Sequence, residues 1–173
     1  ALGALAARWQ EDVIDLRPDV LSVFVGTNDA ERHLGRLLRA DDPKTVPDFD
    51  FADWERTYRG LLDQARQANP ALKIVLCTPF AAPCGKIVEG ALGEYYPLRQ
   101  RILAQCCVIV ERIAADYGAT LVPFHRLIAD LETRLPNGDA TYWVWDGIHP
   151  TPAGQRLMAD CWIGAAARSG VME

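Results

Sequence analysis

Val20-Leu21-Ser22-Val23-Phe24-Val25-Gly26-Thr27-Asn28-Asp29 contains an apolar, β-prone run of six residues that stops at a glycine. A continuous run of this kind is typical of a strand covered on both faces in a parallel sheet. Two later stretches, residues 72–77 and 119–122, have the same character. The sequence therefore predicts three strands of a parallel sheet.

Helices are predicted around these strands. Apolar residues recur at steps of three and four over residues 2–16, 54–69 and 97–117, a short helix is predicted over 124–135, and Thr151-Pro152 is a typical start for a last helix. Residues 30–50 are polar and contain two prolines, which predicts a loop or a short irregular helix, residues 81–96 are predicted to form a long loop, and Asn137-Gly138-Asp139 a turn. Alternating strands and helices predict one α/β domain over residues 1–173, with helices on both faces of the sheet in three layers.

Composition and charge narrow the function classes. The chain has 173 residues, 50% of them apolar, and 18 basic against 23 acidic residues give a net charge of −5. This charge offers no attraction for nucleic acid or an anionic membrane, so a small neutral or cationic substrate is expected. No apolar run approaches the roughly 18–20 residues that span a bilayer. The five cysteines are expected to be reduced core residues, which weakly favours the cytoplasm; residue 1 is not methionine, so the localisation stays unknown.

Two polar motifs are candidates for chemistry. Gly26-Thr27-Asn28-Asp29 ends the first strand, where a short amide side chain can point a donor into a crevice; alternatively, it is a turn in which Asn and Asp cap backbone groups. Trp145-Asp146-Gly147-Ile148-His149-Pro150-Thr151 places a carboxylate three residues before an imidazole. Such a carboxylate can hold one ring nitrogen and leave the other free to accept a proton; alternatively, the motif is a capped helix entry with a structural histidine.

Together, these motifs resemble those of the SGNH/GDSL hydrolase family, and the resemblance extends to the segment from Ala7-Arg8-Trp9 to Pro18-Asp19-Val20. It implies a flavodoxin-like parallel sheet and a serine esterase without metal or organic cofactor. Asn28 would donate its amide to the oxyanion, His149 would be the general base, and Asp146 would hold the imidazole in the correct tautomer. The implied reaction is hydrolysis of carboxylic esters, either small acyl esters or O-acetyl groups on carbohydrate.

The nucleophile departs from the family's pattern. The family carries it in a Gly-Asp-Ser block near the N-terminus, followed by a block whose Gly supplies an oxyanion N–H, and neither block is present. The only serines are Ser22, expected to be buried and hydrogen-bonded in the first strand, and Ser169 in a polar tail. Cys84 is a weaker alternative nucleophile. We therefore expect an N-terminally truncated domain that lacks its first strand, with the nucleophilic serine outside this chain.

The missing strand has a structural consequence. The strand Val20 to Val25 would become an exposed edge, so a missing segment or a partner chain is expected to cover it. A second function class follows from the missing serine: a non-catalytic α/β module that keeps the pocket and binds a ligand or a partner. Replacing His149 by alanine would separate the two, because only hydrolysis depends on the imidazole.

The remaining polar and aromatic residues carry weaker expectations. His33 and His125 match no metal-binding spacing with Asp29, Glu31 or Asp146, so no metal is predicted and His33 is expected to be solvated. Most tryptophans are expected in the core, although Tyr142-Trp143-Val144-Trp145 is a candidate lining for an acyl or sugar pocket.

Overall fold

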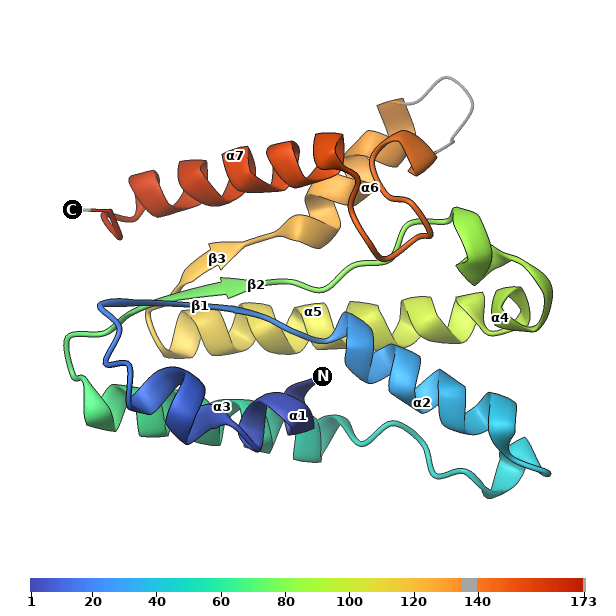
Figure 1. The fold of residues 1–173 in the computed structure, drawn as a ribbon, viewed down its shortest axis with the longest axis horizontal. Helices are drawn as coiled ribbons and strands as arrows, with labels where there is room; N and C mark the ends of the chain where they lie inside the picture. Colours follow the sequence, from blue (N-terminus) through green and yellow to red (C-terminus); the bar gives the residue numbers. More distant parts are fainter. Residues whose placement is uncertain (135–139, 173) are drawn as a thin grey trace.

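The computed structural model describes residues 1–134 and 140–172 and confirms the three-layer α/β architecture. Three parallel strands, β1 (Val20–Phe24), β2 (Lys73–Cys77) and β3 (Thr120–Val122), lie side by side in that order. They form the middle layer in Figure 1. The predicted turn Asn137-Gly138-Asp139 lies outside the described residues.

Two apolar cores flank the sheet because successive side chains of a strand point to opposite faces. Ile74 and Leu76 of β2 belong to one core, whereas Val75 and Cys77 belong to the other. The first core is shared with α1 (Leu2–Ala6), α2 (Thr27–Arg39), α3 (Phe51–Ala68) and α5 (Tyr96–Asp116). The second is shared with α6 (Phe124–Arg134) and α7 (Pro152–Arg168), which lie above the sheet in Figure 1.

The helix starts follow local capping chemistry. Asp50 accepts a hydrogen bond from the Asp53 N–H at the beginning of α3, at 2.8 Å. Thr151 accepts one from the Gly154 N–H at 3.1 Å, and Pro152 occupies the first turn of α7, as predicted. No helix in the described part of the chain is long and apolar enough to cross a membrane. Four of the five cysteines are buried, and Cys161 is half-buried.

Three expectations about secondary structure need correction. Residues 27–39 form the regular helix α2, which the polar composition of residues 30–50 concealed. The predicted helix over residues 2–16 is divided into α1 and a π-helical turn, Gln10–Ile14. The predicted loop over residues 81–96 contains a 3₁₀ turn, Gly85–Val88, and the short helix α4 (Gly90–Glu94).

β1 lies at an edge of the sheet. It pairs with β2 on one side, and no strand of the described residues lies on its other side. Its residues alternate, with Leu21 and Val23 buried and the residues between and beside them exposed. Val20 and Phe24 are 37% and 44% exposed, so this edge presents apolar side chains to solvent.

Candidate active site

A glycine turn places Asn28. Gly26 joins β1 to α2 with φ at +125°, and a Cβ atom at this position would lie 2.7 Å from Pro79 Cγ. Only glycine fits both this backbone conformation and this close approach. The Thr27 hydroxyl donates to the Phe80 carbonyl at 3.0 Å, which ties the start of α2 to the chain that follows β2. Asn28 thereby sits exposed in the first turn of α2, at the carboxyl end of β1.

Asp146 organises the loop that carries His149. Its Oδ2 lies 2.9 Å from His149 Nδ1, and its Oδ1 accepts the backbone N–H groups of Ile148 at 3.1 Å and His149 at 3.0 Å. The carboxylate thus holds both the imidazole ring and the backbone beneath it. The His149 side chain is 67% exposed, and within the described residues its Nε2 makes no hydrogen bond. An imidazole held in this way can accept a proton at Nε2.

The pKa of Asp146 reflects this arrangement. Partial burial of the carboxyl group acts to raise its pKa, but the hydrogen bonds from the His149 ring and from the two backbone N–H groups outweigh burial. The net result is a pKa below the usual range of an aspartic acid. The group is therefore a carboxylate at neutral pH.

A second loop supports the Asp146–His149 loop from behind. Gly147 has a positive φ of +94°, and a Cβ atom at this position would lie 2.3 Å from Ile87 Cδ1, so only glycine fits here. Its carbonyl accepts the Ala82 N–H at 2.8 Å. On the facing loop, a Cβ atom on Gly85, whose φ is +65°, would lie 2.5 Å from Asp146 Cα. The sequence did not predict this contact between the two loops. Its only sign in the sequence is the pair of glycines, Gly85 and Gly147, which both have a positive φ in the structure.

The buried side chain of Arg99 connects both motifs. It is completely buried and donates to Glu31 through Nε at 2.5 Å and through Nη2 at 3.2 Å. Its Nη1 donates to the Ile87 carbonyl at 3.2 Å. Glu31 lies one turn after Asn28 on α2, and Ile87 packs against Gly147. This single guanidinium therefore links the helix whose first turn contains Asn28 to the support of the His149 loop, and no motif in the sequence singled it out.

The structure brings the two predicted motifs together. Asn28 and His149 line the same hollow, of about 220 Å³, which we call the Asn28–His149 hollow. The other residues that line it are Ala1, Phe24, Val25, Gly26, Thr27, Ile148 and Pro150. An amide donor and an imidazole base are thus presented to one space at the carboxyl end of β1.

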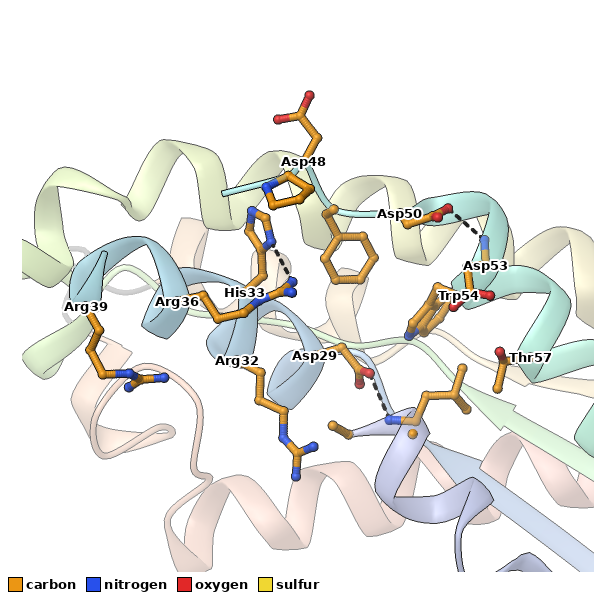
Figure 2. A pocket seen from close by; sticks show the side chains of 15 residues that line it. Asp29, Arg32, His33, Arg36, Arg39, Asp48, Asp50, Asp53, Trp54 and Thr57 are labelled. Carbon is orange, nitrogen blue, oxygen red and sulfur yellow. Dashed lines mark hydrogen bonds between the residues drawn. The ribbon is translucent and has the colours of Figure 1, made fainter. Parts of the chain in front are cut away.

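A larger hollow, of about 650 Å³, lies beside the first, and Ala1 lines both. We call it the α2–α3 hollow (Figure 2) because its walls come from α2, from the start of α3 and from the chain between them. Asp29 fixes its inner end, since its Oδ1 accepts the Leu2 N–H at 2.8 Å. Figure 2 shows Arg32, Arg36 and Arg39 along α2, with Asp50 and Asp53 at the start of α3 on the opposite side.

The alternative nucleophiles are held elsewhere. Ser22 is exposed rather than buried as predicted, but it is hydrogen-bonded, because its hydroxyl accepts the Trp162 Nε1–H at 3.0 Å. The Ser169 hydroxyl donates to the carbonyls at the end of α7. Cys84 is buried, and its thiol donates to the Val144 carbonyl at 3.3 Å. None of the three lines the Asn28–His149 hollow.

Four other residues singled out in the sequence lie outside the Asn28–His149 hollow: His33, His125, Tyr142 and Trp145. His33 is buried, with 3% of its surface exposed, and not solvated as predicted. His125 contacts the Thr78 hydroxyl at 2.7 Å. The described residues contain no group of three or more side chains suited to a metal ion. Trp145 and Tyr142 are exposed, and neither lines the two hollows described above.

The fold and the site define a three-layer α/β protein with a carboxylate–imidazole pair at the carboxyl end of its parallel sheet. More specifically, the chain belongs to the GDSL-like lipase/acylhydrolase family, whose model matches residues 1–157. An acetylxylan esterase from Geobacillus stearothermophilus is 32% identical over 162 residues, which cover 92% of this chain. The chain spans 64% of the length of that esterase.

Solved structures agree with this assignment. A GDSL-like lipase from Parabacteroides merdae superposes with a TM-score of 0.77 at 27% identity, over 96% of this chain and 68% of the other. The Geobacillus acetylxylan esterase superposes with a TM-score of 0.73 at 26% identity, over 95% of this chain and 67% of the other.

Proposed function

We propose that the protein hydrolyses carboxylic esters, and specifically O-acetyl groups on a carbohydrate, by a Ser–His–Asp mechanism. The observation that carries this proposal is the 2.9 Å contact between Asp146 Oδ2 and His149 Nδ1, on a loop that shares a hollow with Asn28. In this proposal the nucleophile is a serine outside these 173 residues, because Ser22 and Ser169 both lie away from that hollow.

The proposed reaction begins when His149 Nε2 takes the serine proton and the serine oxygen attacks the acetyl carbonyl carbon. The carbonyl electron pair moves to oxygen, and the Asn28 amide stabilises this oxyanion; one such donor contributes roughly 3–4 kcal/mol to transition-state stabilisation. The oxyanion collapses, the bond to the sugar oxygen breaks, and the imidazolium returns the proton to that oxygen. Water then releases acetate from the acyl-enzyme by the same proton transfers.

Asp146 has a positioning role in this scheme. Its carboxylate accepts the Nδ1–H of His149, which selects the tautomer with a free Nε2. It also stabilises the imidazolium that forms during attack. Its lowered pKa keeps the Asp146 carboxylate charged at neutral pH.

The substrate assignment is supported by the relatives and by the space available. The similar protein is an acetylxylan esterase, and its Ser-to-Ala variant is described as a catalytic mutant. The Asn28–His149 hollow, of about 220 Å³, suits a small acyl group, and the α2–α3 hollow beside it, of about 650 Å³, has room for sugar units.

The test uses the full-length protein isolated from the cells that produce it. This protein is labelled with a fluorophosphonate, and the adduct is located by intact mass and peptide mapping. The expected adduct is on a serine outside residues 1–173, and it is lost in the variants His149→Ala and Asp146→Asn. Asp160→Asn, on the exposed face of α7, is the matched control and should label normally. An adduct on Ser22 or Ser169 would refute the proposed mechanism, and so would the absence of any adduct on the folded protein. If the protein binds a ligand but forms no adduct, a non-catalytic module is favoured.

A further inference from the structure

The α2 wall of the α2–α3 hollow carries three arginines. Arg32, Arg36 and Arg39 follow one another at steps of four and three, so they share one side of the helix. Among the described residues, none of the three forms an ion pair with a carboxylate. Figure 2 shows these side chains extending from the same helix. Guanidinium groups without a carboxylate partner are well suited to bind a carboxylate through two parallel hydrogen bonds.

His33 lies among these arginines without adding to their charge. It is 3% exposed, and both its burial and the Arg36 guanidinium lower its pKa, while Asp48 opposes this shift. The ring is therefore neutral at neutral pH. Arg36 Nη2 lies 3.2 Å from His33 Nδ1, which as the acceptor orients the guanidinium but leaves its positive charge uncompensated.

Four carboxylates also line the hollow, Asp29 from α2 itself and Asp48, Asp50 and Asp53 from the facing side, and three of them have partners within the protein. Asp50 accepts the Asp53 N–H, and Asp53 forms an ion pair with Arg56 at 2.5 Å. Asp29 accepts the Leu2 N–H through Oδ1. Asp48 is exposed and can accept hydrogen bonds from ligand hydroxyl groups. Asp53 is paired with Arg56, whereas the α2 arginines have no carboxylate partner among the described residues, so their positive charge is available to a ligand.

The inner surface of the hollow has unused hydrogen-bonding groups. Trp54 is 6% exposed, and its indole Nε1–H is buried with no hydrogen-bond partner in the described structure. Asp29 Oδ2 is likewise buried without a partner. Buried polar atoms are costly when unpaired, so a donor and an acceptor that line the same hollow indicate a ligand that provides both. Sugar hydroxyl groups both donate and accept, and the rings of Trp54 and Phe49 offer apolar faces for a sugar ring.

We propose that the α2–α3 hollow is a subsite for a carboxylate-bearing sugar unit, which Arg32 and Arg36 bind while Trp54 and Asp29 bind its hydroxyl groups. This inference rests on the proposed function, because it places an acidic unit of the saccharide beside the site of ester hydrolysis. It differs from the expectation of a neutral or cationic substrate, which came from the net charge of −5 and not from the local charge. The protein would thus prefer acetylated saccharides that carry uronic acid.

The test is direct binding, which requires no nucleophile. Xylotriose with one glucuronic acid branch and unbranched xylotriose are each titrated into the folded protein at low ionic strength and followed by calorimetry. We expect the acidic sugar to bind about tenfold more tightly than unbranched xylotriose, because it gains one charge-assisted hydrogen-bonded contact. Arg32→Gln and Arg36→Gln should each remove most of this preference. Trp54→Phe, which keeps an aromatic ring but removes the N–H, should weaken binding of both sugars equally.

Arg156→Gln is the matched control, because Arg156 is an exposed arginine on α7 that lines neither hollow. It should leave the preference unchanged. Equal affinity for the two sugars would overturn the inference. Inorganic phosphate serves as a competitor: if it binds as tightly as the acidic sugar, the arginines bind any anion and the inference is also wrong. Acidic-sugar binding without a fluorophosphonate adduct would support the subsite while refuting ester hydrolysis, so the two proposals fail separately.

Discussion

At the scale of single residues, Gly147 sets the geometry of the His149 loop. We predict that Gly147→Ala lowers the free energy of unfolding by about 3 kcal/mol, because a positive φ and a Cβ 2.3 Å from Ile87 both oppose the native structure. Denaturant unfolding measures this loss. Gly60→Ala is the control: it lies within α3 with open space around it, and should be neutral or stabilising by about 0.5–1 kcal/mol. Equal effects of the two substitutions would contradict this prediction.

Asp146 predicts a pH-dependent contribution to stability. Its pKa is lower in the folded chain than in the unfolded chain, so its carboxylate stabilises the fold above its unfolded pKa, and this stabilisation is lost as pH falls through the folded pKa. We expect Asp146→Asn to reduce the free energy of unfolding by about 1 kcal/mol at pH 7, discounted for partial exposure. The difference from the parent should disappear below the folded pKa. A difference that is constant between pH 7 and pH 3 would exclude this origin.

Much of the candidate site could be predicted from short motifs, because Asp146 and His149 lie close in sequence and their contact is local. The burial of His33 could not, since it depends on the packing of Phe49 edge-on against its ring, with centroids 5.8 Å apart. The role of Arg99 was also hidden: it lies within a helical stripe of apolar residues, and its partner Glu31 is 68 residues away.

At the scale of secondary structure, the Glu31–Arg99 pair joins α2 to α5. We predict that Arg99→Leu costs about 3–5 kcal/mol of unfolding free energy, because it leaves Glu31 without its partner in a largely buried position. The double variant Glu31→Leu/Arg99→Leu should recover much of this loss, since an apolar pair of similar size needs no desolvation of charge. Thermal and denaturant unfolding of the three proteins check this. If the double variant is no more stable than Arg99→Leu, the pair does not act as a unit.

Helices and strands were predicted where their apolar residues recur at a regular spacing. The strands and α3, α5 and α7 have apolar residues at unmistakable steps, and all were predicted. α2 has a stripe as well, formed by Ala30, Leu34 and Leu37, but its charged residues and the prolines beyond it made residues 30–50 look like a loop. The π-helical turn at Gln10–Ile14 has no comparable signature in the sequence.

At the scale of the whole molecule, the edge of the sheet at β1 remains open to pairing. We propose, as the sequence suggested, that another segment or a partner chain covers this edge. Val20→Lys is then expected to reduce hydrophobic-dye binding and self-association without a change in far-UV circular dichroism, because a charged edge residue resists further strand pairing. Both proteins are prepared as residues 1–173 alone, and a parent chain of this length that is monomeric and binds no dye would contradict the proposal.

The two hollows could not have been predicted from local sequence. The α2–α3 hollow combines residues from 1–3, 29–39 and 47–57, and its neighbour combines Ala1 with residues 24–28 and 148–150. Parallel topology predicts that strand ends gather at one edge, but the spaces between loops depend on how those loops pack.

The first turn of α2 has an electrostatic consequence. Gly26 precedes the helix without a side-chain cap, and the residues at this helix start, Gly26, Thr27 and Asn28, line the Asn28–His149 hollow. The aligned peptide dipoles of 13 residues place a partial positive charge at that end. In the proposed mechanism, negative charge that develops in the hollow would therefore be stabilised by the helix dipole as well as by the Asn28 amide. Removal of that amide alone would leave the contribution of the helix axis intact.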